Sequence, residues 1–175
     1  MQISVKANTY IYLAILLLII PLPWVASWLI AVTFHELCHW LAVKLCRSEV
    51  YVLKIGIGGA EMQCGNMTQG CRLFSVLCGP VGGFLLVGLG RWLPKVAICS
   101  FCLSVYNFLP LLPLDGGRAL CILMKDSKRF YTFEKMFLTL LVLMGIFCAF
   151  FLELGIFPLA FVIVLWLKKR KIPCK

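Results

Sequence analysis

Charged side chains are scarce in this sequence, and acidic ones are the scarcest. Only 14% of the 175 residues are Asp, Glu, Lys or Arg, with seven acidic residues against 17 basic ones. A soluble domain usually carries about 25% charged residues, whereas here 62% of the residues are hydrophobic and the mean hydropathy is +0.99. This composition excludes an ordinary soluble protein and predicts a multi-pass integral membrane protein that lies in a lipid bilayer.

The sequence also lacks the spaced cysteine pattern of a secreted disulfide scaffold. Its ten cysteines are scattered through apolar runs without a repeating interval, so we expect reduced packing residues. The net charge of +10 calls for no nucleic-acid partner, because Lys and Arg collect on the cytoplasmic side of membrane proteins. No A-x-A cleavage site follows the first apolar run, which favours a membrane span over a signal peptide.

Apolar segments of membrane-spanning character recur along the chain. They predict an all-α polytopic membrane protein in a single domain, residues 1–175, with about six transmembrane helices. Residues 10–120 would form its core, and residues 137–167 would add two C-terminal spans. The expected helices cover residues 7–20, 24–46, 73–93, 96–114, 137–152 and 155–167.

The segment between the second and third expected helices has a different character. Residues 50–62 are β-prone and bend at glycines, which include Gly58 and Gly59. This pattern predicts a short β-hairpin at the membrane surface or dipping into it. An unpaired edge of the hairpin could hold an unwound substrate as an added strand, so we expect Gly58 and Gly59 to contact substrate.

Basic residues divide unevenly between the two sides of the expected spans. All 17 except Arg91 and Lys95 fall on the side that holds both termini. Because Lys and Arg are enriched in cytoplasmic segments, both termini are predicted to be cytoplasmic. The second and fourth spans then both run inward, and residues near their inner ends can share one depth.

Only two histidines occur in the chain, and both belong to the run His35-Glu36-Leu37-Cys38-His39. Residues four apart share a helix face, so the two imidazoles can bind one metal ion with Glu36 beside it. Ionisable residues inside a membrane helix are costly and usually functional. The motif predicts one catalytic zinc ion on His35 and His39, with Glu36 as the general base.

Catalytic zinc usually takes a third protein ligand. Asp115 is the best candidate, because it lies among prolines and glycines that break the fourth span, at a similar expected depth. Glu61 in the hairpin is the competitor, whereas Glu153 falls on the opposite side of the membrane. Asn107, just before the break, is expected either to orient substrate and stabilise developing charge or to cap the helix.

Three motifs together resemble those of the site-2 protease family of intramembrane zinc metalloproteases, most closely the branch typified by stage IV sporulation protein FB. The run from His35 to His39 matches H-E-x-x-H. Residues 107–117 match N-x-x-P-x-x-P-L-D-G-G, and Gly79-Pro80 is similar to an intervening Gly-Pro motif.

The resemblance implies that His35, His39 and Asp115 bind zinc, that Glu36 is the catalytic base and that Asn107 lies near substrate. It also implies a protein of the bacterial cytoplasmic membrane. Such a protein would hydrolyse a peptide bond of a membrane-embedded or membrane-tethered protein near the cytoplasmic face. A regulatory or sporulation factor precursor is the expected kind of substrate.

One departure from the family pattern keeps an alternative open. The Gly-Pro motif of the family often carries asparagine three residues after the proline, where this chain has Gly83. We also expect no PDZ or CBS regulatory domain. The alternative is a catalytically inactive membrane adaptor of the same fold, while a metal carrier is less favoured because the polar residues are confined to one depth.

Overall fold

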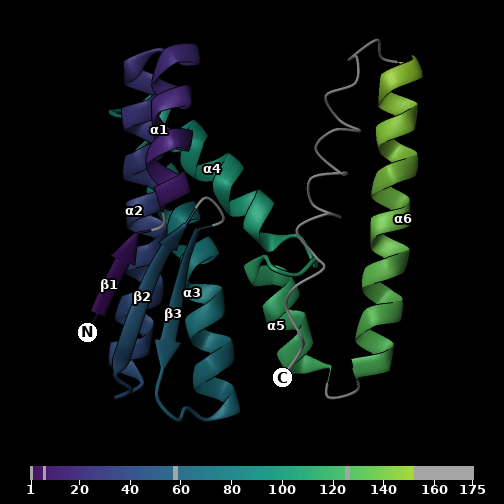
Figure 1. Ribbon diagram of the computed structural model, residues 1–175. Helices are drawn as coiled ribbons and strands as arrows, with labels where there is room; N and C mark the ends of the chain where they lie inside the picture. Colours follow the sequence, from purple (N-terminus) through teal and green to yellow (C-terminus); the bar gives the residue numbers. More distant parts are fainter. Residues whose placement is uncertain (1, 6, 57–58, 125–126, 152–175) are drawn as a thin grey trace. The chain divides into compact units, whose positions relative to one another are not determined.

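The computed structural model describes residues 2–5, 7–56, 59–124 and 127–151 (Figure 1). Within these residues the chain forms six helices and three strands. It divides into two compact units, Met1–Asn107 and Phe108–Lys175, each of which is described by itself. The mostly helical architecture agrees with the prediction from sequence.

The helix that carries the histidine motif begins at a proline break. After α1 (Ala7–Ile19), Pro21 is the N-cap of α2 (Leu22–Leu45), and a second proline, Pro23, lies in its first turn. Proline is well tolerated at a helix start, where its missing N–H would have had no intrahelical partner. The break predicted between the first two helices is therefore confirmed.

A Schellman turn ends α2. Arg47 adopts a left-handed backbone with a φ of 53°. Its N–H donates to the Lys44 carbonyl at 2.9 Å, and the Ser48 N–H donates to the Val43 carbonyl at 3.2 Å. These two bonds satisfy carbonyls of the last helical turn and direct the chain into the sheet.

The predicted hairpin is present between α2 and α3. Strands β2 (Val50–Gly56) and β3 (Gly59–Cys64) pair antiparallel. A third strand, β1 (Gln2–Val5), pairs parallel to β2 and was not predicted, because four residues are too few to show a periodicity. The order β1-β2-β3 leaves β3 at one edge of the described sheet.

Small residues bring α3 close to its neighbours in the first unit. Helix α3 (Gln69–Val87) packs against α2, and its buried positions include Ser75, Gly79, Gly82 and Gly83. Such residues allow backbones in membrane helices to approach closely. Ser100 in α4 (Pro94–Phe108) donates its hydroxyl to the Gly83 carbonyl at 2.8 Å, which bonds α4 to α3.

Two predicted helix boundaries are wrong. The fourth helix, predicted to reach residue 114, ends at Phe108, because Pro110 and Pro113 follow and cannot continue it. A loop then leads into α5 (Asp115–Leu123). Helix α6 (Ser127–Phe151) starts well before the predicted residue 137, because the basic segment that precedes this residue forms its first turns.

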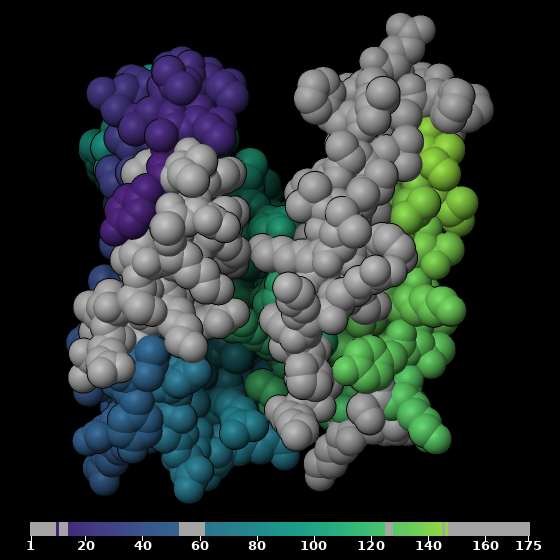
Figure 2. Space-filling model, viewed as in Figure 1, coloured from purple at the N-terminus to yellow at the C-terminus, as the bar shows by residue number. Residues whose placement is uncertain are grey.

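Two of the described helices, α2 and α3, are long and apolar enough to cross a membrane. At 1.5 Å per residue, α1 is only about 20 Å long. The surface of α6, green to yellow in Figure 2, carries large apolar side chains that are more than half exposed: Met136, Leu140, Leu143 and Met144. The number of spans remains a prediction, and the expected helix over residues 155–167 lies outside the described residues.

Candidate metal centre

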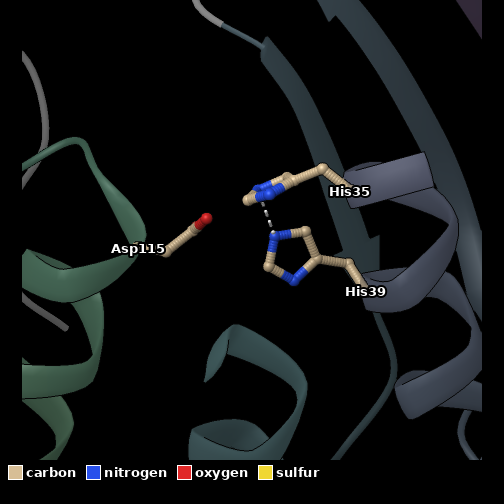
Figure 3. A group of neighbouring side chains, drawn as sticks. All are labelled: His35, His39 and Asp115. Carbon is tan, nitrogen blue, oxygen red and sulfur yellow. Dashed lines mark hydrogen bonds between the residues drawn. The ribbon is translucent and has the colours of Figure 1, made fainter. Parts of the chain in front are cut away.

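Two imidazoles lie together on α2 within the first unit (Figure 3). His35 and His39 have ring centroids 4.8 Å apart and Nε2 atoms 3.2 Å apart, and His35 is only 3% exposed. In a tetrahedral zinc site with Zn–N bonds near 2.05 Å, two ligand nitrogens lie about 3.3 Å apart. The spacing of the two Nε2 atoms therefore fits two ligands of one zinc ion.

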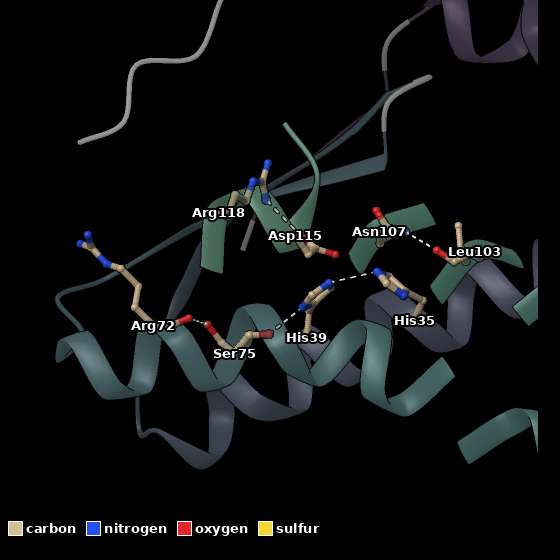
Figure 4. A network of polar contacts seen from close by, with 8 residues as sticks. All are labelled: His35, His39, Arg72, Ser75, Leu103, Asn107, Asp115 and Arg118. Carbon is tan, nitrogen blue, oxygen red and sulfur yellow. Dashed lines mark hydrogen bonds and ion pairs between the residues drawn. The ribbon is translucent and has the colours of Figure 1, made fainter. Parts of the chain in front are cut away.

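The second ring nitrogen of His39 is held by α3. Its Nδ1 lies 2.7 Å from the carbonyl oxygen of Ser75 (Figure 4). A carbonyl can only accept, so Nδ1 carries the proton and a neutral ring has its lone pair on Nε2. The Ser75 hydroxyl in turn donates to the Arg72 carbonyl at 2.9 Å. This is the outer-shell arrangement that fixes the tautomer and orientation of a metal-binding histidine.

Two glycines of α3 make room for the motif. A Cβ at Gly79 would overlap the His39 imidazole at Nε2 and Cε1, and a Cβ at Gly82 would overlap the Cys38 sulfur. The glycines around Pro80 thus let α2 and α3 approach closely. The contact explains why residue 79 has no side chain beside the His39 imidazole.

Glu36 follows His35 on α2 and is half-buried. Its position one residue from His35 results from the helix itself, as the motif predicted. The role of general base remains a prediction.

Asp115 belongs to the second unit, where it is the first residue of α5 (Figure 3). It is 7% exposed, and Arg118 Nη1 lies 3.9 Å from its Oδ1. A carboxylate in the first helical turn interacts favourably with the helix dipole. Asp115 is thus a buried carboxylate within its own unit, and its role as a ligand remains a prediction.

The side-chain amide of Asn107 bonds within its own helix. Its Nδ2 donates to the Leu103 carbonyl at 3.1 Å, four residues earlier (Figure 4). This bond lies within α4 and caps none of its terminal carbonyls, so helix capping and contact with substrate both remain predictions. Of the two hairpin glycines, Gly59 begins β3 and Gly58 lies outside the described residues. Glu61, the competing ligand, lies in β3.

Two cysteine thiols of the first unit, Cys46 and Cys64, have a raised pKa. Burial raises the pKa of Cys64, and a hydrogen bond with the Cys71 thiol raises the pKa of Cys46 to about 11. The thiolate is the metal-binding form, so these two thiols compete poorly for zinc. Cys121 is disulfide-bonded, which makes the expectation of reduced cysteines wrong at that position.

One buried acid was missed from the sequence. Glu134 falls between the expected helices 96–114 and 137–152, yet it lies in α6 and has no exposed surface. The available signal was its spacing, because Phe130, Glu134 and Leu138 recur every four residues and share a helix face. Lysines and arginines around it concealed this pattern.

Comparison with known proteins shows a likeness in fold. No family model matches the chain, and no curated protein matches it in sequence. Among solved structures, the Site-2 Protease from Methanocaldococcus jannaschii matches with a TM-score of 0.64 and 19% sequence identity. The match covers 99% of this chain and 94% of the other. This chain has the fold of a site-2 protease.

The shared fold agrees with the resemblance to site-2 proteases at the level of the fold. Together with the apolar helices α2 and α3, it indicates a membrane protein. The donor chemistry also fits, since two imidazoles and one carboxylate are a common ligand set for catalytic zinc.

Proposed function

We propose that the chain is an intramembrane zinc metalloendopeptidase that cleaves a membrane-embedded or membrane-tethered protein near the cytoplasmic face. The observation that carries the proposal is the 3.2 Å separation of the His35 and His39 Nε2 atoms. The hydrogen bond from His39 Nδ1 to the Ser75 carbonyl supports it, because this bond directs the Nε2 lone pair toward a metal. The site-2 protease fold supports the reaction class.

In this proposal Asp115 is the third ligand of one zinc ion held by His35 and His39. Support comes from the burial of its carboxylate at the first turn of α5 and from the motif 107–117. When bound, zinc acidifies a water molecule and polarises the substrate carbonyl. Buried surroundings strengthen such electrostatic effects.

Glu36 then has the proton-transfer role. Its carboxylate takes a proton from the attacking water and later gives it to the leaving amine. Its place on α2 beside His35 supports this assignment, since a general base must lie within hydrogen-bond reach of the water that the metal activates.

Substrate is proposed to bind as an added strand along β3. The order of the described sheet leaves β3 at an edge, and main-chain hydrogen bonds can hold an extended peptide without a strict side-chain code. Gly59 begins this strand, and Gly58, Gly59 and Asn107 are proposed to contact the bound chain. A precursor of a membrane-tethered regulatory or sporulation factor in a bacterial cytoplasmic membrane is the proposed kind of substrate.

The test is cleavage of a reporter with a transmembrane segment by purified protein in proteoliposomes. Glu36→Gln and Asp115→Ala should each lower the cleavage rate by at least about a hundredfold, in line with loss of a general base or a ligand. Glu49→Gln is the matched control, because Glu49 is exposed and outside the motif. Unchanged cleavage in both site variants would contradict the proposed mechanism.

An inactive adaptor of the same fold is the second candidate. The sequence reason for it was Gly83, and the structure gives that glycine a packing role, since a Cβ there would overlap the Ser104 hydroxyl. Elemental analysis of purified protein separates the two candidates. About one zinc per chain supports the protease, whereas none after zinc loading supports the adaptor.

A further inference from the structure

A carboxylate occupies the centre of the inward face of α6. Phe130, Glu134 and Leu138 are 0%, 0% and 8% exposed, and they repeat every four residues. The outer two positions hold apolar side chains, as a packed helix face requires. Glutamate is almost never fully buried unless it is paired, so the middle position needs a specific explanation.

The explanation lies in the loop before α5. Glu134 Oε1 accepts a hydrogen bond of 3.0 Å from the backbone N–H of Leu112, which is 22 positions earlier in the chain. Both groups are buried, and Leu111, Leu112 and Leu114 are each at most 5% exposed. A hydrogen bond to a carboxylate is stronger than one between neutral groups, so this contact fixes the loop firmly to α6.

The same loop is also fitted closely to the start of α5. A Cβ at Gly116 would overlap the Phe108 carbonyl, and a Cβ at Gly117 would overlap the Leu111 carbonyl. Leu114 is the N-cap of α5, and Asp115 is its first residue. The backbone between Leu112 and Asp115 is therefore constrained from both sides, by glycine contacts and by the Glu134 bond.

We propose that Glu134 is a positioning residue for the zinc site. By accepting a hydrogen bond from the Leu112 N–H, it fixes the conformation of the loop and thereby the orientation of the Asp115 carboxylate. The inference rests on the proposed role of Asp115 as a zinc ligand. Groups one step removed from metal ligands typically change metal affinity by 10- to 100-fold when they are altered.

Two substitutions of similar size separate this role from simple packing. Glu134→Gln retains an oxygen acceptor for the Leu112 N–H, whereas Glu134→Leu fills the space and removes the acceptor. Thr139→Ala is the control, because Thr139 is exposed on the same helix and its hydroxyl bonds to the Lys135 carbonyl of that helix. If Glu134 contributes packing alone, the leucine variant should match the glutamine variant in Leu112 amide exchange and in zinc affinity.

The experiment uses the full chain in detergent micelles with two readouts. The first is amide hydrogen exchange of the peptide containing Leu112 in metal-free protein, and the second is zinc affinity by competition with a chromophoric chelator. In Glu134→Leu we expect exchange on the order of tenfold faster and zinc affinity on the order of tenfold weaker. Glu134→Gln should stay within about threefold of the parent in both, a rescue that packing does not explain.

The contrary outcomes are distinct. Slow Leu112 exchange or full zinc affinity in Glu134→Leu overturns the inference, and so does a loss of both in a folded Glu134→Gln protein. Exchange in the α2–α3 peptides reports whether each variant is folded, and if the leucine variant is not, the glutamine variant decides. If the proposed function is wrong instead, the result is different. His35→Ala then retains zinc, while the residue at position 134 still determines the rate of Leu112 amide exchange.

Discussion

The helix α2 and the loop before α5 present their polar residues in opposite ways. On α2, the positions of His35 and His39 follow from the helical repeat, and one contact across to Ser75 completes the orientation of a ring. Asp115 instead follows an irregular loop whose backbone is held by Glu134, far along the chain. The comparison teaches that a local motif can place two imidazoles side by side, whereas the placing of the Asp115 carboxylate depends on long-range contacts.

The glycines of the two regions also differ in what they leave room for. In α3, Gly79 and Gly82 leave room for side chains of α2, whereas Gly116 and Gly117 leave room for the backbone of their own loop. A side chain can move away at modest cost, but a displaced backbone shifts everything that follows it. Substitutions in the two regions should therefore fail in different ways.

The largest effect is expected on α2 itself. His35→Ala removes one of two imidazoles whose Nε2 atoms are 3.2 Å apart and should lower zinc affinity by more than about a hundredfold. Leu37→Ala, an exposed position on the same helix, should leave affinity unchanged. Chelator competition measures both, and equal affinities would show that α2 holds no metal.

The next effect tests the space beside His39. Gly79→Ala would place a methyl group on the imidazole and should weaken zinc binding by about 10- to 100-fold. Gly70→Ala is the matched control on α3, because a Cβ there meets nothing within 4 Å, and alanine usually stabilises a helix by about 0.5–1 kcal/mol over glycine. If both variants bind zinc like the parent, the clearance has no role in metal binding.

Substitution of a loop glycine should mainly lower the stability of the second unit. Gly117→Ala would press on the Leu111 carbonyl and should destabilise the second unit by about 1–3 kcal/mol. Denaturant unfolding in micelles measures the change, with Gly70→Ala again as control. Stability equal to that of the parent would mean that the loop accommodates a side chain without cost.

The smallest effect concerns the contact of α4 with α3. Ser100→Ala removes the buried hydroxyl that donates to the Gly83 carbonyl and should cost about 0.6–1 kcal/mol, the usual value for such a bond in a membrane protein. Thr139→Ala, which removes an exposed bond within its own helix, should cost close to nothing. A cost above about 2 kcal/mol for Ser100→Ala would indicate a role beyond this one bond.

Several features were predictable because they depend on neighbours in the chain. The α2 motif, the proline break before it and the glycine-bent hairpin all follow from spacing within short segments. Strand β1 was missed because four residues are too few to show a periodicity and its partner β2 is distant in the chain. The early start of α6 was missed because the segment before residue 137 is rich in Lys and Arg. Glu134 was missed for the same reason, since its charge matched that of a surface loop while its partner lay 22 positions away.

The sequence by itself determined the apolar character of the chain and the placing of two imidazoles on one helix face, because composition and helical repeat are local properties. Tertiary structure decided which glycines are obligatory, which nitrogen of His39 is protonated and which acid is buried in α6. The physical reason is that these depend on the close approach of backbones and on hydrogen bonds between segments far apart in the chain. A residue's type alone does not specify such contacts.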